Sequence, residues 1–430
     1  MRAGFGSCSI TPAESIWMGG YIARVKPSMG VLHDLRARAL MIEDDSGQAS
    51  VIVSTDLLGL TRHLSDQVAA AAFQRFGIPR ERLLLTSSHT HSGPVIEGCL
   101  MDMYDMPPEQ IDRVRAFTAQ LPEKILSAID SARNHLEDCR LLFGAGNASF
   151  AMNRREYTAD GIINGVNPIG PRDESVPVLR VERLDGSLAG VVFGYACHNT
   201  TTMSYLLNGD YAGFAEMDVE ASKGNPVGMF VMGCGADINP IPRGTLEQAQ
   251  HYGSLLSHVV LSLGNGDLVP VHGNVRTARR EVSLSLAGLP TRDQLLEETR
   301  SDNFVVRRRA QRLLDQLERQ GRLEDHHSYP VQVWSFGKGL LVIALAGEVV
   351  VDYSLRLKHE FGSANTWVIG YAEDVFAYIP SIRILREGGY EGGESMLYYG
   401  IHGSWQPQVE ELILEAVREA VHEVLSRTAS

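Results

Sequence analysis

The feature that most constrains this chain is a pair of histidines at the end of an apolar strand. Residues 83–85 are three leucines, and the polar stretch that follows holds His89 and His91 before a Gly-Pro turn. Open α/β sheets present their reactive groups at such strand ends. Histidine is the commonest neutral metal ligand, and two histidines at i and i+2 share a side only if the backbone is extended. The stretch therefore predicts half of a metal site.

Other strand ends repeat this pattern, and without them the pair would carry little weight. In a chain with 14 histidines, a single His-x-His pair is more often incidental than functional. Residues 191–193 form an apolar run that leads to His198, and residues 340–345 form one that leads to Glu348, where a helical pattern begins. A further run, residues 227–232, enters a glycine-rich loop with Asp237 and Asn239.

These strand ends together hold the residue types of a catalytic zinc centre. Such a centre combines neutral imidazoles, a carboxylate and a vacant position, where a water binds and its pKa falls towards neutrality. The candidates are His89, His198 and Glu348. Three more carboxylates compete for the same role, and spacing does not choose among them: Asp56, Asp210 and Asp237. A purely structural zinc is disfavoured because no fourth Cys or His completes the set.

Composition excludes several other classes of protein. The net charge is −13 and no Lys/Arg cluster relieves it, which argues against nucleic acid or an anionic membrane as a partner. No apolar run reaches the roughly 18 residues that cross a bilayer, and no apolar signal core follows Met1. We therefore expect a cytoplasmic protein with a small-molecule substrate and no stable membrane insertion. Five cysteines, odd in number and unpatterned, predict reduced buried thiols.

The order of predicted elements favours an α/β fold. Residues 38–43 and 49–56 flank a turn and predict a hairpin, residues 64–76 predict a helix, and the histidine strand follows. Longer helical patterns cover residues 108–135, with a break at Pro122, residues 303–322 and residues 409–425. We expect a mixed β-sheet core with flanking helices and an active site at strand ends. No repeat or linker divides the chain, so we expect one domain over residues 1–430.

Short motifs in a fixed order connect most of the chain to a known family. They are Ser9-Ile10-Thr11-Pro12, Met18-Gly19-Gly20-Tyr21, His89-Thr90-His91-Ser92-Gly93-Pro94, Asn153-Arg154, Asn167-Pro168, residues 196–203 and 209–215, Ala236-Asp237-Ile238-Asn239-Pro240, Gly347-Glu348, and Tyr378 with Tyr390. This ordered set resembles the neutral/alkaline non-lysosomal ceramidase family. The zinc-dependent catalytic domain of that family hydrolyses the N-acyl amide bond of ceramide.

The resemblance implies a role for each of these residues. The zinc ligands that it implies are His89, His198, Glu348 and Tyr378. It also places three donors around the scissile group, where they would polarise the carbonyl and hold the oxyanion: His91, Arg154 and Tyr390. The two tyrosines are twelve residues apart, as the paired tyrosines of the family are. A tyrosine chosen without this resemblance would more often be a ring in the interior of a sheet.

The chain departs from the family at one functional position. Where ceramidases carry a serine that is proposed as catalytic, this chain has Asn239. An amide cannot act as a serine-like nucleophile, so zinc-bound water has to attack and Asn239 is at most a hydrogen-bonding group at the centre. We also expect neither the immunoglobulin-like C-terminal domain nor the secretion signal of the family. The expected substrate is therefore smaller than long-chain ceramide in a bilayer.

The sequence predicts a zinc-dependent hydrolase that cleaves the amide bond of a small or medium N-acylated substrate by attack of zinc-bound water. One alternative is an esterase or lactonase that uses the same zinc centre. Another is a non-catalytic, zinc-containing relative that binds a ligand and lost catalysis with the serine. Retention of Arg154 and Tyr390 beside all the implied ligands weighs against the second alternative. The acyl group, the amine and the oligomeric state are not predicted.

Overall fold

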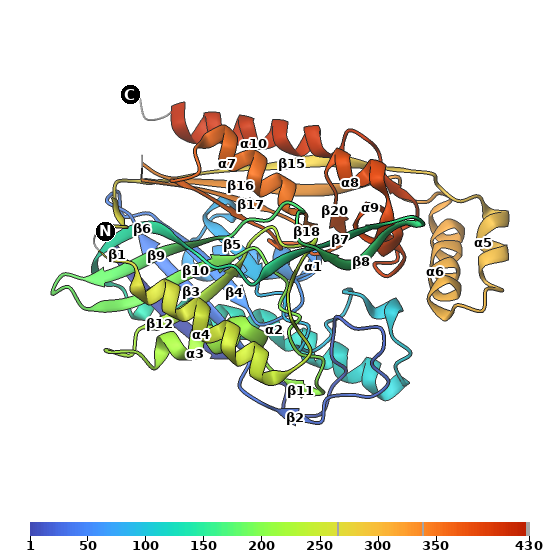
Figure 1. Cartoon of the computed structure of the whole chain (residues 1–430), viewed down its shortest axis with the longest axis horizontal. Helices are drawn as coiled ribbons and strands as arrows, with labels where there is room; N and C mark the ends of the chain where they lie inside the picture. Colours follow the sequence, from blue (N-terminus) through green and yellow to red (C-terminus); the bar gives the residue numbers. More distant parts are fainter. Residues whose placement is uncertain (265, 338, 427–430) are drawn as a thin grey trace.

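Two β-sheets packed face to face between layers of helices make up the computed structural model, which describes residues 1–264, 266–337 and 339–426 (Figure 1). Side chains from both sheets, among them Leu40, Trp334 and Ile369, form a shared core between the layers. Each outer face is covered by helices, so both sheets are buried on two sides. The predicted α/β class, with a mixed sheet core and flanking helices, is confirmed.

The larger sheet has nine strands in mixed orientation. Its order is β12 (Val227–Met232), β10 (Leu188–Tyr195), β9 (Ser175–Arg183), β6 (Glu137–Asn147), β1 (Arg2–Ser9), β3 (Arg36–Glu43), β4 (Ala49–Thr55) and β5 (Leu83–Ser87), while β14 (Val269–Val271) pairs with β6. The pairs β4–β5 and β10–β12 are parallel, and β3–β4 is the predicted antiparallel hairpin. Helix α1 (Arg62–Phe76), also predicted, links β4 to β5.

The larger sheet curls until its two edges meet. Strand β12 at one edge contacts β4 and β5 at the other. Ser54 Oγ of β4 donates a hydrogen bond of 2.6 Å to the carbonyl of Phe230 in β12. Beyond the strand ends the contact continues as a bridge between Thr90 and Asn199. Closure of the sheet therefore brings the loop after β5, with its two histidines, against the loop after β10.

The smaller sheet forms the second layer. Its order is β19 (Thr366–Ile369), β17 (Leu340–Leu345), β16 (His326–Phe336), β15 (Val275–Ala287) and β21 (Ser404–Trp405). Helices α7 (Val351–Phe361) and α10 (Val409–Ser426) cover its outer face (Figure 1). The apolar stripe predicted for the last helix is buried there, with Ile413, Val417 and Ala420 in the core. This burial confirms that the last helix, α10, packs on the core of the fold.

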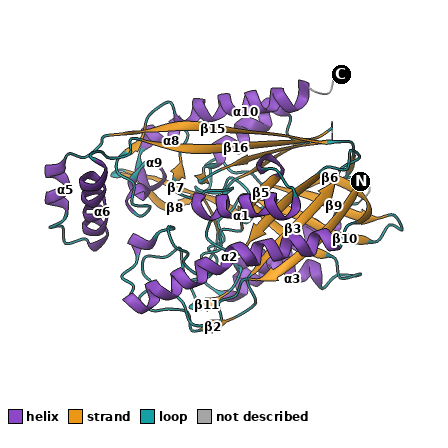
Figure 2. Ribbon diagram, turned by 180° about the vertical axis from the view of Figure 1, so that it is seen from behind, coloured by secondary structure: helices purple, strands orange, loops and turns teal. Residues whose placement is uncertain are grey.

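Further helices cover the outer face of the larger sheet, and Figure 1 and Figure 2 show them from opposite sides. They are α2 (Pro108–Asn134), which packs on β1 and β3, and α3 (Asp210–Glu220) with α4 (Leu246–Ser262). The predicted break at Pro122 is wrong, because α2 continues through it. Leu121, Ile125 and Leu126 on either side are buried in the core, and this packing outweighs the backbone bond that proline removes.

Short elements carry most of the remaining candidate residues. A three-stranded sheet joins β13 (Ile238–Pro240), β7 (Ala151–Thr158) and β8 (Gly161–Asn167), while β18 (Glu348–Val349) pairs with β20 (Tyr378–Ile379) and β2 (Gly30–Val31) with β11 (Leu206–Leu207). Short helices follow at α8 (Ile382–Glu387), α9 (Gly389–Gly392), η1 (Arg80–Arg82), η2 (Met101–Met103) and η3 (Glu394–Leu397). The hairpin of α5 (Arg292–Glu298) and α6 (Phe304–Gln320) projects from one end of the molecule with a small core of its own (Figure 1).

The structure also bears on the expectations about membrane-spanning helices and cysteines. None of the helices in the described ranges is long and apolar enough to cross a lipid bilayer. All five cysteines are free thiols; Cys8 is half-buried and the other four are buried.

A methyl group at Gly6 should disrupt the packing of β1 on α2. A Cβ at Gly6 would lie 2.2 Å from the carbonyl oxygen of Ala128 and 2.3 Å from the nitrogen of Ala132, and these backbone atoms cannot rotate away. We expect Gly6→Ala to lower the free energy of unfolding by about 1–3 kcal/mol, as overpacking does. Denaturant titration measures this. Gly266→Ala is the control, since its Cβ would meet no atom within 4 Å, and equal stability of the two variants would contradict the packing argument.

Candidate metal centre and active site

Three distant parts of the chain meet in one buried cluster. His89 is the second residue after β5, His198 is the third after β10, and Glu348 begins β18. Glu348 Oε2 lies 3.3 Å from His89 Nε2 and 3.2 Å from His198 Nε2. Both imidazoles are fully buried and Glu348 is only 3% exposed. The structure thus brings together the three residues that the sequence selected as metal ligands.

Backbone carbonyls determine which nitrogen of each imidazole faces the cluster. His89 Nδ1 donates to the carbonyl of Leu58 at 2.5 Å, and His198 Nδ1 donates to the carbonyl of Gly235 at 2.7 Å. A carbonyl can only accept, so the proton of each neutral ring is on Nδ1. Both Nε2 atoms therefore point their lone pairs at Glu348, as histidine ligands of metals do.

The cluster is a meeting point of hydrogen-bond acceptors. His198 Nε2 and Glu348 Oε2 have no hydrogen-bond partner among the described residues, although both are buried. Buried acceptors this close repel one another unless a cation lies between them. Two imidazole nitrogens and one carboxylate oxygen are a donor set that zinc and similar divalent metals prefer. The residues present therefore fit a metal ion.

Electrostatics keeps the cluster in the protonation states that bind metals. Burial, together with the nearby charge of Arg154, lowers the pKa of His198 to about 4. Burial alone would raise the pKa of Glu348; the charged forms of His89 and His198 would outweigh it and hold that pKa well below its usual value, and a bound cation would have the same effect once both rings are neutral. At neutral pH the ring of His198 is neutral and the carboxyl group is ionised, so neither has to lose a proton before binding a metal.

His91 lies at the open side of the same cluster. Its Nε2 is 3.1 Å from His89 Nε2, and the ligand atoms of His89, His91 and His198 all lie within 4.8 Å of one another. His91 is half-buried, whereas the other two rings are fully buried. Its Nδ1 has no hydrogen-bond partner among the described residues. The position fits a third imidazole ligand as well as the predicted partner of a substrate.

The backbone at His89 differs from the sequence prediction. The two histidines were expected to share a side because the loop is extended, but His89 has φ 56°, in the left-handed region. A non-glycine residue there is strained by about 1–3 kcal/mol, and such strain gathers at functional sites. The ring of His89 packs on Tyr371 at 4.2 Å between centroids, and Tyr371 also has a positive φ, 54°. The side chains of His89 and His91 therefore lie together because of the packing around His89, and not because the loop is extended.

The three competing carboxylates are engaged elsewhere. Each accepts a hydrogen bond from a backbone N–H, at 2.8 Å for Asp56, 3.0 Å for Asp210 and 2.8 Å for Asp237. The donor to Asp237 is Val351, the first residue of α7, so this carboxylate caps that helix. Glu348 is the one carboxylate among these four that faces the imidazoles.

Arg154 in β7 connects the other candidate residues. Its Nε donates to Glu391 Oε1 at 2.7 Å, its Nη2 donates to the hydroxyl of Tyr378 at 3.1 Å, and its Nη1 lies 3.5 Å from Asn239 Oδ1. Its guanidinium also lies 5.5 Å from the ring centroid of Tyr390. One buried cation therefore gathers three residues that the sequence placed at the reacting centre, and Glu391 anchors it.

Backbone pairing of two short strands positions Tyr378 next to the cluster. Strands β18 and β20 are parallel, and their register sets Tyr378 directly beside Glu348. Burial, and next the negative charge of Glu348, raise the pKa of Tyr378 well above its usual value, while Arg154 opposes them. Its role as the fourth ligand stays a prediction, as do the roles of the other candidate residues.

Sequence reasoning missed two residues that position the site. Tyr399 donates its hydroxyl hydrogen bond to Glu348 Oε1, the oxygen that faces away from the imidazoles. Glu391 holds Arg154, as described above. Glu391 follows directly after Tyr390, but neither spacing nor residue type distinguishes Tyr399 from the other tyrosines of the chain. Only the folded structure shows these contacts.

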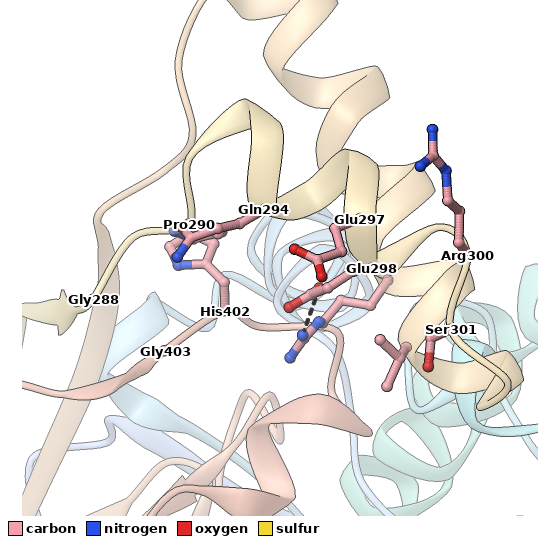
Figure 3. A pocket seen from close by; sticks show the side chains of 11 residues that line it. Gly288, Pro290, Gln294, Glu297, Glu298, Arg300, Ser301, His402 and Gly403 are labelled. Atoms are coloured by element: carbon pink, nitrogen blue, oxygen red, sulfur yellow. Dashed lines mark hydrogen bonds and ion pairs between the residues drawn. The ribbon is translucent and has the colours of Figure 1, made fainter.

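A large groove lies away from this chemistry. It has a volume of about 800 Å³, and α5, the start of α6 and the segment around His402 line it (Figure 3). Two of its charged side chains, Arg309 and Glu298, form an ion pair at 2.8 Å. It holds none of the candidate residues. The site is therefore assigned from the converging ligands and not from the size of a groove.

Comparison with known proteins identifies the family of the chain. Residues 1–236 match the family described as neutral/alkaline non-lysosomal ceramidase, N-terminal. The chain belongs to this family, which confirms the resemblance found in the sequence.

Similar proteins include neutral ceramidase A from Dictyostelium discoideum, 26% identical over 266 residues, and neutral ceramidase from Drosophila melanogaster, 24% identical over 260 residues. Each alignment covers 56% of this chain and 36% of the relative, so the chain matches about a third of the length of these curated relatives. A crystal structure of neutral ceramidase from Pseudomonas aeruginosa is similar with a TM-score of 0.74 and 20% identity, over 99% of this chain and 74% of that one. A ceramidase complexed with C2 has the same TM-score at 19% identity, over 98% of this chain and 75% of that one. At this identity the likeness shows the fold.

Removal of the Tyr399 hydroxyl should weaken metal binding without unfolding the chain. Tyr399→Phe deletes the donor that orients Glu348, and loss of such an outer contact costs about 10–100-fold in metal affinity. Zinc titration against a competing chelator measures this change, with thermal unfolding as a check on folding. The control is Tyr398→Phe, the neighbouring tyrosine, which makes no contact with Glu348. Equal zinc affinity in the two variants would show that the hydrogen bond does not orient the carboxylate.

Proposed function

We propose that this chain is a zinc-dependent hydrolase that cleaves the amide bond of a small or medium N-acylated substrate. The convergence of His89 Nε2, His198 Nε2 and Glu348 Oε2 carries the proposal, because no donor among the described residues satisfies the last two atoms. Tyr378 is the proposed fourth ligand. Membership of the ceramidase family supports amide hydrolysis, since the relatives are named for the cleavage of ceramide.

The residues around the cluster would bind and polarise the substrate. When bound, zinc supplies a Lewis acid for the scissile carbonyl and lowers the pKa of a water molecule. Arg154 holds a fixed positive charge beside Tyr378, because Glu391 anchors its Nε. A donor that is already oriented stabilises a developing oxyanion without reorganisation during the reaction. Tyr390 is half-buried, its ring centroid lies 5.5 Å from this guanidinium and 5.2 Å from the ring of Tyr378, and it is the second proposed donor.

His91 and Asn239 are the other two residues proposed to contact the substrate. The Nδ1 atom of His91 has no partner among the described residues and belongs to the ring at the open side of the cluster. The Nε2 atom of His91, which lies 3.1 Å from His89 Nε2 at the cluster, is the atom proposed to exchange a proton or a hydrogen bond with the substrate. Asn239 is held by Arg154 Nη1 at 3.5 Å and by Thr200 Oγ1 at 3.4 Å, which suits a binding group and not a nucleophile.

A substrate panel tests the proposed function. The zinc-loaded protein is assayed on N-acyl amides, esters and lactones of matched chain length, and we expect turnover of amides. His89→Ala and His198→Ala should each lose zinc, from about one ion per chain, together with activity, because each removes a ligand.

Other results of the panel would favour the alternatives. Hydrolysis of esters or lactones with inert amides would make the protein an esterase or lactonase. Zinc retained with no turnover of any acyl compound would favour the non-catalytic relative. Unchanged zinc content in both histidine variants would contradict the proposed metal site itself.

A comparison of the two neighbouring histidines separates their roles. His91→Ala should retain zinc and lower kcat/KM by about 10²–10³-fold, or about 2.7–4 kcal/mol, which is the effect of a lost oxyanion donor. His89→Ala should lose zinc, because its Nε2 faces Glu348. Zinc content and kcat/KM on the best amide are the measurements. Loss of zinc in His91→Ala would instead make this ring a third imidazole ligand.

A further inference from the structure

A cation without an acidic partner lies beside the candidate site. Arg243 is exposed and follows β13 by three residues. Its Nη1 donates to Thr200 Oγ1 at 3.1 Å, and this hydroxyl in turn donates to Asn239 Oδ1 at 3.4 Å. Asn239 is itself 3.5 Å from Arg154 Nη1. One threonine hydroxyl therefore separates Arg243 from the group of residues at the proposed reacting centre.

The loop that carries Arg243 is held in place. The N–H of Gly244 donates to the carbonyl of Thr201 at 2.7 Å, and the hydroxyl of Tyr252 donates to the carbonyl of Pro242 at 2.6 Å. These bonds fix the backbone on both sides of Arg243. A side chain presented from a fixed backbone loses less entropy when it binds a ligand.

The charge of Arg243 is not compensated within the described part of the chain. Its one hydrogen bond is to Thr200, which leaves Nε and Nη2 free, and no carboxylate lies within ion-pair distance. The nearby carboxylate of Asp210 is buried and accepts backbone N–H donors. Glu391 is already shared between Arg154 and Arg155. A free cation here is unexpected in a chain with a net charge of −13.

A second uncompensated arginine lies near His91. Arg24 is 5% exposed, and its guanidinium donates to backbone carbonyls, including Ser204 at 3.3 Å, with no carboxylate partner among the described residues. It lies 4.9 Å from the ring centroid of Tyr21, whose ring is 5.0 Å from that of His91. Burial lowers the pKa of Arg24, and the nearby Tyr104, Tyr21 and Tyr205 oppose this only in part. The surroundings of the site are therefore locally positive, which favours an anionic ligand.

We propose that Arg243 binds a carboxylate on the amine portion of the substrate, so that the substrate is an N-acyl amino acid. This inference rests on the proposed amide hydrolysis. The two free nitrogens Nε and Nη2 match the two oxygens of a carboxylate, which arginine binds in a bidentate manner. In an N-acyl α-amino acid a single carbon separates the scissile nitrogen from the carboxylate. A carboxylate on Arg243 thus keeps the scissile amide close to Asn239 and Arg154.

Two substrates of equal size and different charge test this. N-hexanoylglycine and N-hexanoylglycinamide share the acyl chain and differ in a carboxylate against a carboxamide, and release of hexanoate reports cleavage of the same bond in both. We expect the wild type to prefer N-hexanoylglycine by at least about tenfold in kcat/KM, as for a charge-assisted hydrogen bond. Arg243→Gln should remove this preference by raising KM for the acid alone, and Arg243→Lys should restore part of it.

Controls separate the charge of this residue from general effects. Arg322→Gln makes the same change in net charge at an exposed arginine beyond the end of α6 and should keep the preference. N-(3-carboxypropanoyl)ethanolamine carries its carboxylate on the acyl side and should be a poor substrate. Faster cleavage of this compound than of N-hexanoylglycine by the wild type would overturn the inference. So would an equal preference for N-hexanoylglycine over N-hexanoylglycinamide in wild type and Arg243→Gln.

Direct binding distinguishes failure of this inference from failure of the proposed function. Calorimetry measures the Kd of both hexanoyl compounds on wild type and Arg243→Gln, whether or not either is cleaved. Hydrolysis of the neutral amide without tighter binding of the acid would overturn the carboxylate site and leave the amidase intact. Tighter binding of the acid that is lost in Arg243→Gln, without hydrolysis of either compound, would support the carboxylate site and count against the amidase.

Discussion

The meeting of buried acceptors at Glu348 Oε2 is the constraint on which the rest of the site depends. Its partners, His89 Nε2 and His198 Nε2, lie 3.3 and 3.2 Å away, where uncompensated negative or lone-pair density is costly to bury. Bonds on the far sides hold each group in place: backbone carbonyls take both Nδ1 protons, and Tyr399 binds the other oxygen of Glu348. The repulsion among these acceptors favours the binding of a cation, because few other ligands would relieve that repulsion.

The two-sheet fold supplies the rigidity that such a cluster needs. The nine-stranded sheet curls so that the loops after β5 and β10 touch, and this contact brings the two imidazoles together. Glu348 and Tyr378 come from the other half of the chain, as a parallel pair of short strands packed against the five-stranded sheet. The family match covers residues 1–236, so it includes both imidazoles but not Glu348. The half of the site beyond the matched residues therefore depends on the fold, which the neutral ceramidase structure shares over 99% of this chain.

Local patterns in the sequence predicted the elements but not the contacts between them. The hairpin β3–β4, helix α1 and the apolar stripe of α10 follow from hydrophobic periodicity, which depends on neighbouring residues only. The break at Pro122 was wrong because core packing on both sides of it, which no local rule contains, holds α2 together. The choice among carboxylates depends on contacts between residues far apart in the chain, and Tyr399 lies 51 positions from Glu348. The single domain over residues 1–430 stays a prediction.

Asn239 connects the proposed reacting centre to the proposed carboxylate site. A serine hydroxyl at this position could serve as a nucleophile, but its shorter side chain could not hydrogen-bond to partners on both sides, as the longer asparagine does. The amide of Asn239 accepts hydrogen bonds from Arg154 and Thr200 with one atom and donates to Asn164 with the other. Thr200 then contacts Arg243, so an unbroken hydrogen-bonded path runs from the residue beside Tyr378 to an uncompensated cation at the surface. If that cation binds the substrate carboxylate, Asn239, which the resemblance sets at the position of the family serine, becomes the link that aligns the bound acid with the reacting carbonyl. Loss of the nucleophile and a shift from a neutral lipid amide to an N-acyl amino acid would then have a common structural cause.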